Sequence, residues 1–204
     1  MVIVIWGMVY IPHDKFARRA RQEGFRARSS YKLLDLQRKF KVLKPGDHVL
    51  DLGAAPGSWL QVAAQIVGKE GKVLGLDRTA MKPLTWPNVR MVQKDIFDAD
   101  MVEFLGAQGY KSFDVVLSDV APNTTGVKER DQALAHELSL RVLDIALELL
   151  KRGGVLVIKV FEGPETPGLI KEVEKHFSSV KLVKPEASTK GSRELYLVAK
   201  NYKS

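Results

Sequence analysis

Apolar residues follow two alternating periods along the chain from position 45 onward. Short, nearly continuous apolar runs are typical of buried strands, whereas longer segments with apolar residues three or four positions apart predict helices. The short runs predict strands over 48–52, 72–77, 89–93, 113–118, 155–160, 180–183 and 194–199. The helical spacing predicts helices over 58–67, 98–108, 130–150 and 166–177, and we expect the third of these to end at Gly153 and Gly154.

Strands that alternate with helices predict an α/β fold with a mostly parallel sheet covered on both faces, a doubly wound, Rossmann-like arrangement. Residues 184–193, which join the last two predicted strands, are polar and too few for a crossover helix. We therefore expect an antiparallel pair at one edge of the sheet.

The N-terminal part of the chain is predicted to be a helical extension of the same domain. Residues 15–40 have a helical pattern that Gly24 interrupts. Residues 1–7 either form an additional edge strand or precede the true start at Met8. We expect one domain, in which 1–44 is a basic extension and 45–204 is the α/β unit.

Composition excludes several classes of function. The 204 residues are 45% hydrophobic and 27% charged, which is typical of a globular protein with a real core. The chain has no cysteine, which excludes disulfides, thiolate zinc sites and a cysteine nucleophile, and its four scattered histidines predict no metal centre. The longest apolar run, 1–11, is too short to span a bilayer and lacks the pattern of a signal peptide. We expect a cytosolic protein that does not contact membranes.

The net positive charge is confined to one end of the chain. The formal net charge is +8, and residues 1–44 carry 11 basic and three acidic side chains, whereas 45–204 carry 21 of each. Such a basic segment next to a neutral domain is typical of a protein that binds a polyanion. A solvated basic helix without a partner is the alternative. The aromatic residues that interleave the segment favour nucleic acid.

A glycine-rich turn, DLGAAPGSW over 51–59, follows the first predicted strand. Parallel sheets bind ligands at the carboxyl ends of their strands, where Gly53 and Gly57 would let the backbone approach a ligand closely. Such a turn can also simply pack a helix against a strand. Three acids at strand ends, Asp51, Asp77 and Asp95, favour a binding site. Asp77 ends the second predicted strand and is placed to accept from ribose hydroxyls, and Asp95 follows the third and is placed to accept from an adenine amino group.

The sequence of this turn separates two adenosine-containing cofactors. GAAPG departs from the GxGxxG of nicotinamide-dinucleotide sites, and its proline offers no backbone N–H to a pyrophosphate. S-Adenosylmethionine contains adenosine but no phosphate, so acids and a tight turn suffice for it. We therefore predict S-adenosylmethionine as the cofactor, with a nicotinamide-dependent dehydrogenase as the weaker alternative.

Four more motifs occur in order along the chain: RARSSYKL at 26–33, SDVAPN at 118–123, VIKVFEG at 157–163 and SRELY at 192–196. With DLGAAPGSW they make the chain resemble the FtsJ-type ribose 2′-O-methyltransferases. The resemblance implies a seven-stranded sheet with an antiparallel last strand, and it makes 45–204 the methyltransferase catalytic domain. It also implies a catalytic tetrad of Lys32, Asp119, Lys159 and Glu194. The cofactor pocket implied by the resemblance contains Gly57, Trp59, Asp77, Asp95 and Asp119.

Methyl transfer to a ribose 2′-hydroxyl requires alignment of the hydroxyl with the methyl group and removal of its proton. A free lysine, with a pKa of about 10.4, is protonated at neutral pH and cannot act as the base. Burial and a second lysine nearby would favour a neutral Lys159, while Asp119 opposes that effect and positions the amine. We predict Lys159 as the general base, with Lys32 and Glu194 positioning the ribose. A purely steering role for Lys159 is the alternative.

The resemblance implies RNA as the substrate. The compact form of the chain is similar to enzymes that methylate a uridine ribose in the A-loop of large-subunit ribosomal RNA, within the assembled subunit. Methylation of tRNA anticodon-loop riboses, often with a partner protein, is the first alternative. A non-catalytic RNA-binding module is the second, and the intact tetrad counts against it. We expect a monomer that needs no metal ion.

Overall fold

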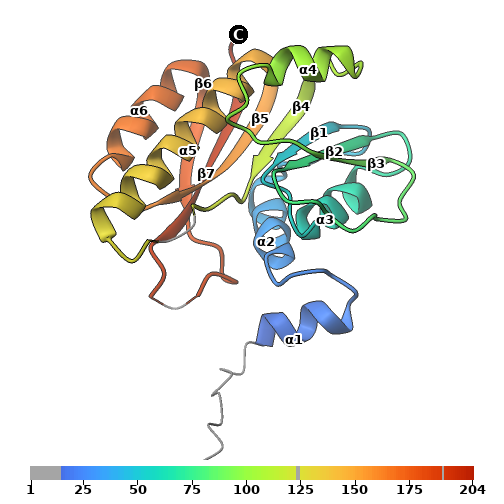
Figure 1. The fold of residues 1–204 in the computed structure, drawn as a ribbon, viewed down its shortest axis with the longest axis horizontal. Helices are drawn as coiled ribbons and strands as arrows, with labels where there is room; N and C mark the ends of the chain where they lie inside the picture. The colour runs from blue at the N-terminus through green and yellow to red at the C-terminus, as the bar shows by residue number, and fades with distance from the viewer. Residues whose placement is uncertain (1–14, 123–124, 190) are drawn as a thin grey trace, which may run out of the picture.

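A single seven-stranded sheet with helices on both faces forms the protein (Figure 1). The computed structural model describes residues 15–122, 125–189 and 191–204. Its strands are β1 (His48–Leu52), β2 (Lys72–Asp77), β3 (Val89–Gln93), β4 (Phe113–Ser118), β5 (Leu150–Phe161), β6 (Phe177–Val183) and β7 (Glu194–Tyr202). Its helices are α1 (Lys15–Gln22), α2 (Ser30–Phe40), α3 (Ser58–Val67), α4 (Met101–Ala107), α5 (Lys128–Leu149) and α6 (Thr166–His176).

The order of strands across the sheet is β3-β2-β1-β4-β5-β7-β6. The first five of these pair in parallel, and β7 lies antiparallel between β5 and β6. The predicted α/β fold with a mostly parallel sheet is confirmed, including its antiparallel final strand. The strand order reverses between β1 and β4, and parallel sheets of this kind bind ligands at that switch point.

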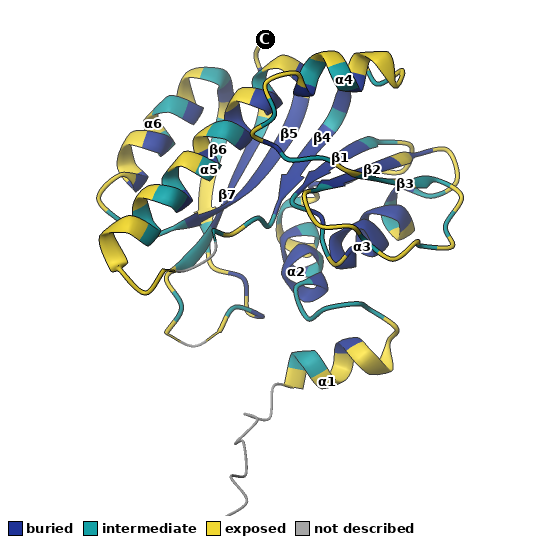
Figure 2. Cartoon of the chain, in the orientation of Figure 1, coloured by how far each residue is buried: buried dark blue, intermediate teal, exposed yellow. Residues whose placement is uncertain are grey.

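Alternate residues of each central strand enter two different hydrophobic layers. In β1, Val49 joins the layer that includes α2 and α3, whereas Leu50 and Leu52 join the layer that includes α4, α5 and α6. Because both faces of the sheet are covered, the central strands are buried along most of their length (Figure 2). This burial explains the nearly continuous apolar runs in the sequence.

The basic N-terminal segment is tied into the fold through α2. Leu33 and Leu36 of this helix are fully buried in the layer formed with α3. The helical pattern of 15–40 is interrupted at Gly24, which has φ +76°, but the interruption is longer than predicted and extends from 23 to 29. The expectation for residues 1–7 lies outside the described residues.

Two predicted helix boundaries were wrong. The predicted helix 98–108 contains only Met101–Ala107 as α4. The helix predicted to stop at two glycines ends earlier, at Leu149, and β5 begins at Leu150. The glycines instead lie within β5, where the register against β4 shifts between Phe113 and Val115. In the described part of the chain, no helix is long and apolar enough to cross a membrane.

Candidate active site

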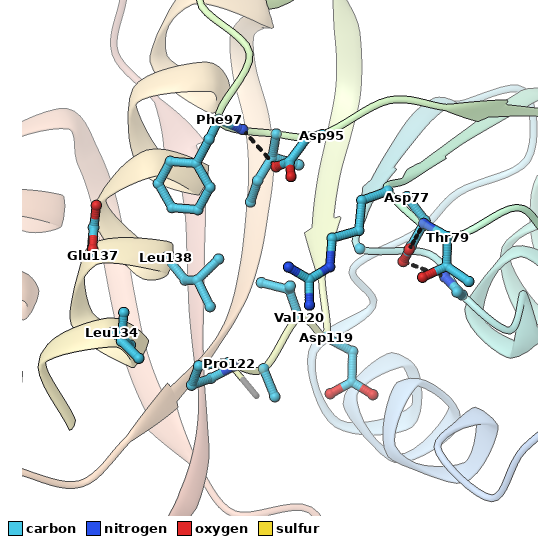
Figure 3. Close-up of a pocket in the computed structure, with 15 residues that line it drawn as sticks. Asp77, Thr79, Asp95, Phe97, Asp119, Val120, Pro122, Leu134, Glu137 and Leu138 are labelled. Atoms are coloured by element: carbon cyan, nitrogen blue, oxygen red, sulfur yellow. Dashed lines mark hydrogen bonds between the residues drawn. The ribbon is translucent and has the colours of Figure 1, made fainter. Parts of the chain in front are cut away.

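A cavity of about 590 Å³ opens at the carboxyl ends of the central strands. Its polar side includes Asp77, Asp95 and Asp119, which follow or end three different strands (Figure 3). The opposite side is mainly apolar and is made by Phe97 and by Leu134 and Leu138 of α5, with Glu137 on the same helix. The lining residues are Gly53, Ala55, Asp77, Arg78, Thr79, Asp95, Ile96, Phe97, Asp119, Val120, Ala121, Pro122, Leu134, Glu137 and Leu138.

Backbone N–H groups hold two of these carboxylates in place. Asp77 accepts hydrogen bonds from the N–H of Ala55, at 2.9 Å, and of Thr79, at 2.7 Å. Asp95 accepts one from the N–H of Phe97 at 3.0 Å. Asp95 is therefore fixed by its own loop, and Asp77 by its own loop and by the glycine-rich turn.

The glycine-rich turn approaches the loop after β4 too closely for any side chain at Gly53. This residue has φ +77°, and a Cβ atom there would lie 2.6 Å from Cβ of Val120. Gly57 has φ +102° and precedes α3, but it is not among the residues that line the cavity. Its predicted cofactor contact stays a prediction.

Trp59 lies behind the cavity rather than in its wall. The side chain is buried, its indole N–H donates to the carbonyl of Ser29 at 2.8 Å, and its ring centroid lies 5.8 Å from that of Tyr196. These contacts connect α3 with the segment before α2 and with β7. The predicted contact of Trp59 with the cofactor also stays a prediction.

The four predicted tetrad residues come together next to this cavity. Lys159 Nζ lies 3.1 Å from Oδ1 of Asp119 and also donates to the Asp119 carbonyl. Lys32 Nζ lies 2.6 Å from Oε1 of Glu194 and 3.9 Å from Oδ1 of Asp119. Both lysines are buried, with 7% and 8% of Lys32 and Lys159 exposed. Two lysine amino groups thus face two carboxyl groups in a site largely shielded from water.

Strand register explains how residues so distant in sequence meet. Antiparallel pairing places Lys159 opposite Tyr196, and Phe161 opposite Glu194. Side chains two residues apart lie on the same face of a strand, so Lys159 shares the face of Val157, which is the face that α2 covers. Lys32 reaches the same place from α2, and Asp119 directly follows β4.

Tyr196 is a site residue that sequence reasoning missed. Its hydroxyl donates a hydrogen bond to Oδ1 of Asp119, and Lys32 Nζ lies 5.6 Å from the centroid of its ring. Burial, followed by the negative charges of Asp119 and Glu194, raises the pKa of Tyr196 well above its ordinary value, so the hydroxyl remains a donor. The sequence signal that could have identified Tyr196 is its position two residues after Glu194 in a predicted strand, because side chains two residues apart lie on the same face.

Asp51, the residue before the last of β1, is buried with 1% of its surface exposed, and its Oδ2 has no hydrogen-bond partner among the described residues. Burial, followed by the charges of Asp119 and Asp77, raises the pKa of this carboxyl well above its ordinary value. Three acids therefore converge at the switch point of the sheet, and one of them has an unsatisfied oxygen. An unsatisfied buried oxygen is the kind of group that a polar ligand completes, but Asp51 is not among the residues that line the cavity.

Comparison with known proteins decides the family. The sequence profile of the FtsJ-like methyltransferases matches residues 25–202. The chain belongs to the FtsJ-like methyltransferase family. It is 46% identical over 185 residues to ribosomal RNA large subunit methyltransferase E of Desulfatibacillum aliphaticivorans, covering 91% of this chain and 88% of that protein. The protein of the same name from Methanothermobacter thermautotrophicus is 42% identical and covers 93% and 90%.

Solved structures agree with this assignment. The methyltransferase superimposes with a TM-score of 0.77 on a Plasmodium falciparum protein described as a ribosomal RNA methyltransferase, at 31% identity, covering 87% of this chain and 98% of that one. Aeropyrum pernix fibrillarin, solved with bound S-adenosylmethionine, has the same fold at 18% identity and a TM-score of 0.59, covering 83% and 73%. The predicted family, fold and methyltransferase activity are confirmed, and the S-adenosylmethionine cofactor rests on membership of this methyltransferase family.

Proposed function

We propose that this methyltransferase modifies a ribose 2′-hydroxyl in large-subunit ribosomal RNA, and specifically a uridine of the A-loop. The observation that carries the proposal is the convergence of Lys32, Asp119, Lys159 and Glu194 beside the carboxylate-lined cavity. Asp119 belongs to both, so it joins the proposed transfer site to the cofactor site. The relatives named as ribosomal RNA large subunit methyltransferases support the choice of substrate.

The residues around the cavity fit S-adenosylmethionine. Asp77 and Asp95, each anchored by backbone N–H groups, present carboxylate oxygens for the ribose hydroxyls and the adenine amino group. The unsatisfied Oδ2 of Asp51 and the glycine at position 53 agree with a polar ligand packed closely against the turn. When bound, S-adenosylmethionine supplies a methyl group that its sulfonium centre makes electrophilic. We propose that Gly57 and Trp59 support this pocket from behind.

Lys159 is the residue proposed to take the hydroxyl proton. Its amine directs hydrogen bonds at the carbonyl and at Oδ1 of Asp119, and these two contacts fix its direction. A neutral amine with both N–H groups engaged in this way retains a lone pair for the 2′-hydroxyl proton. Lys32, held by Glu194 at 2.6 Å, is then placed to orient the ribose oxygens. Tyr196 keeps the Asp119 carboxylate in position.

The basic N-terminal segment is proposed to hold the RNA. It carries the whole net charge of the chain, and it leads directly into the helix that supplies Lys32. Phosphate contacts from this segment give affinity without depending on sequence, which suits a folded target in an assembled subunit. We propose a monomeric enzyme that works in the cytoplasm, where that subunit is found.

The test is methyl transfer from labelled S-adenosylmethionine to large ribosomal subunits that lack the modification, with bulk tRNA in parallel. We expect label on the subunits only, recovered as 2′-O-methyluridine after digestion. Lys159→Ala should reduce the rate by at least about a hundredfold, which is typical for loss of a general base. Lys151→Ala, on the same strand but paired with Asp114 at its other end, is the matched control and should retain activity.

Other outcomes would assign a different function. Label on tRNA alone would contradict the ribosomal substrate and favour the anticodon loop. Binding of RNA and S-adenosylmethionine without transfer to either RNA would favour a non-catalytic RNA-binding module. An unchanged rate in Lys159→Ala would contradict the proposed base and favour a steering role for this lysine.

A further inference from the structure

Arg26 belongs to the basic segment, yet its half-buried side chain lies against the protein surface and bonds to the backbone. One guanidinium nitrogen, Nη1, donates to the carbonyl of Pro56 at 2.9 Å, and the other, Nη2, donates to the carbonyl of Pro83 at 2.7 Å. These two carbonyls are far apart in sequence, and the planar guanidinium connects them. Arginine is suited to such a bridge because its donors are arranged in a rigid fork.

The backbone around Arg26 is fixed by Gln61 of α3. The side-chain carbonyl of Gln61 accepts from the N–H of Arg26 at 2.8 Å, and its amide nitrogen donates to the carbonyl of Gly24 at 2.9 Å. Gln61 is itself buried. The backbone at Arg26 is therefore held by a buried side chain of the domain.

Both carbonyls held by Arg26 belong to segments that shape the cofactor cavity. Pro56 lies in the glycine-rich turn, between Gly53 and Gly57. Pro83 lies in the loop after β2, which begins with the cavity residues Arg78 and Thr79. The bridge thus connects the turn under one side of the cavity with the loop on another side.

Gly57 leaves room for this bridge. A Cβ atom at position 57 would lie 3.0 Å from Nη1 of Arg26, and the backbone there has φ +102°. Glycine at this position therefore both permits the turn and keeps the guanidinium in contact with the Pro56 carbonyl. A glycine is therefore favoured at position 57 by the contact with Arg26, whether or not Gly57 touches the cofactor.

We propose that Arg26 is a positioning residue for the cofactor pocket, which holds the loop 78–88 against the turn 53–57 and strengthens S-adenosylmethionine binding. It thereby differs from the basic residues of the same segment proposed to contact RNA. Because Arg26 precedes α2 in one continuous segment with Lys32, the bridge also couples the substrate-binding arm to the cofactor pocket. The proposal depends on the proposed function only through the cofactor.

The experiment compares Arg26→Lys and Arg26→Gln with Arg21→Lys and Arg21→Gln, at an exposed position of α1. Affinity for S-adenosylmethionine is measured by calorimetry without RNA, and amide hydrogen exchange is followed over residues 78–88. Lysine keeps the charge but cannot bond to both carbonyls at once. We expect both Arg26 variants to bind the cofactor about tenfold more weakly and to exchange faster over 78–88. We expect the Arg21 variants to match the wild type in both measurements.

Affinity for ribosomal RNA, measured at several salt concentrations, distinguishes a basic residue that contacts RNA phosphates from one that holds the cofactor pocket in place. We expect Arg26→Lys to bind RNA with the wild-type affinity and salt dependence, because it retains the charge. Wild-type cofactor affinity in Arg26→Lys, together with weaker RNA binding in Arg26→Gln, would overturn the proposal and make Arg26 an RNA contact. Should Arg26→Gln not fold, the cofactor affinity of Arg26→Lys decides alone. Cofactor binding is measured without RNA, so a wrong choice of RNA substrate would leave this result unaffected.

Discussion

Three groups from different elements lie close to a single carboxylate oxygen, Oδ1 of Asp119, and two of them donate hydrogen bonds to it. Lys159 of β5 lies 3.1 Å from it, Lys32 of α2 lies 3.9 Å from it, and the hydroxyl of Tyr196 of β7 donates to it. Asp119 therefore fixes the distance between the two lysines. Tyr196 contributes a donor that stays protonated, because its pKa lies well above its ordinary value through burial and the nearby negative charges.

Tyr196→Phe removes this hydrogen bond while the ring can still pack against Trp59. We expect kcat to fall about tenfold, since a hydrogen bond to a charged group contributes about 1.5–3 kcal/mol. Cofactor affinity should stay within about twofold, because Tyr196 does not line the cavity. Tyr202→Phe, which removes a hydroxyl bonded to the carbonyl of Leu147 away from the site, is the control for loss of a buried hydroxyl. Equal loss of kcat in both variants would contradict a specific role for Tyr196.

At the scale of elements, the turn between β1 and α3 determines how closely two loops approach. The backbone of Gly53 has φ +77°, and its N–H donates to the carbonyl of Leu76 at the end of β2 at 2.8 Å. The loop after β4, with Val120, packs directly against the glycine. This contact places Asp119, the residue before Val120, beside the cavity.

Gly53→Ala tests this contact against backbone strain alone. Alanine at φ +77° is strained by about 1 kcal/mol, and its Cβ would also lie 2.6 Å from Cβ of Val120, which must move. Gly109→Ala has a similar φ of +86° with no atom within 4 Å of the added Cβ, so it measures the strain alone. We expect Gly53→Ala to lose more stability in urea unfolding, and at least about tenfold in cofactor affinity. Equal effects of the two substitutions would show that the approach of Val120 is unimportant.

The stability of the whole molecule depends on pH through buried carboxyl groups. Burial, with the charges of Asp119 and Asp77, keeps the pKa of Asp51 well above its ordinary value. In the unfolded chain this carboxyl ionises at about pH 4. Above that pH, up to the native pKa, the folded protein keeps a proton that the unfolded chain has lost. The free energy of unfolding therefore falls with rising pH, by at most about 1.4 kcal/mol per pH unit.

Asp51→Asn removes this titration, so the stability of the variant relative to the wild type should increase as pH rises from about 4.5 to 6.5. Urea unfolding of both proteins at several pH values measures this difference in the free energy of unfolding. Asp114→Asn is a control of opposite sign: burial by itself would raise the pKa of Asp114, but hydrogen bonds from Lys151 and the backbone of His48 outweigh it and lower the pKa. Its wild-type carboxylate stabilises the fold above about pH 4, and that advantage is lost at lower pH. The same pH trend in both variants would refute the assignment for Asp51.

Local patterns were sufficient to predict most elements. The predicted strands 48–52, 72–77, 89–93 and 113–118 and the helix 58–67 coincide with β1, β2, β3, β4 and α3. Burial, periodicity and turn glycines are properties of a few neighbouring residues, so the sequence expresses them directly. Boundaries failed where pairing between strands decided them, as at the start of β5, where a register shift against β4 extends the strand back to Leu150.

The sequence by itself determined the class of fold, because alternating periods are local, and its motifs, through the resemblance to a family, selected Asp77, Asp95 and the four tetrad residues as candidates. Only the tertiary structure decided which atoms meet. The place of β7 between β5 and β6 brings Tyr196 to Asp119. Burial leaves Oδ2 of Asp51 without a partner among the described residues. Arg26, in the basic N-terminal segment, donates to the carbonyls of Pro56 and Pro83. The physical reason is that hydrogen bonds and desolvation depend on distances between residues far apart in the chain, which no local pattern contains.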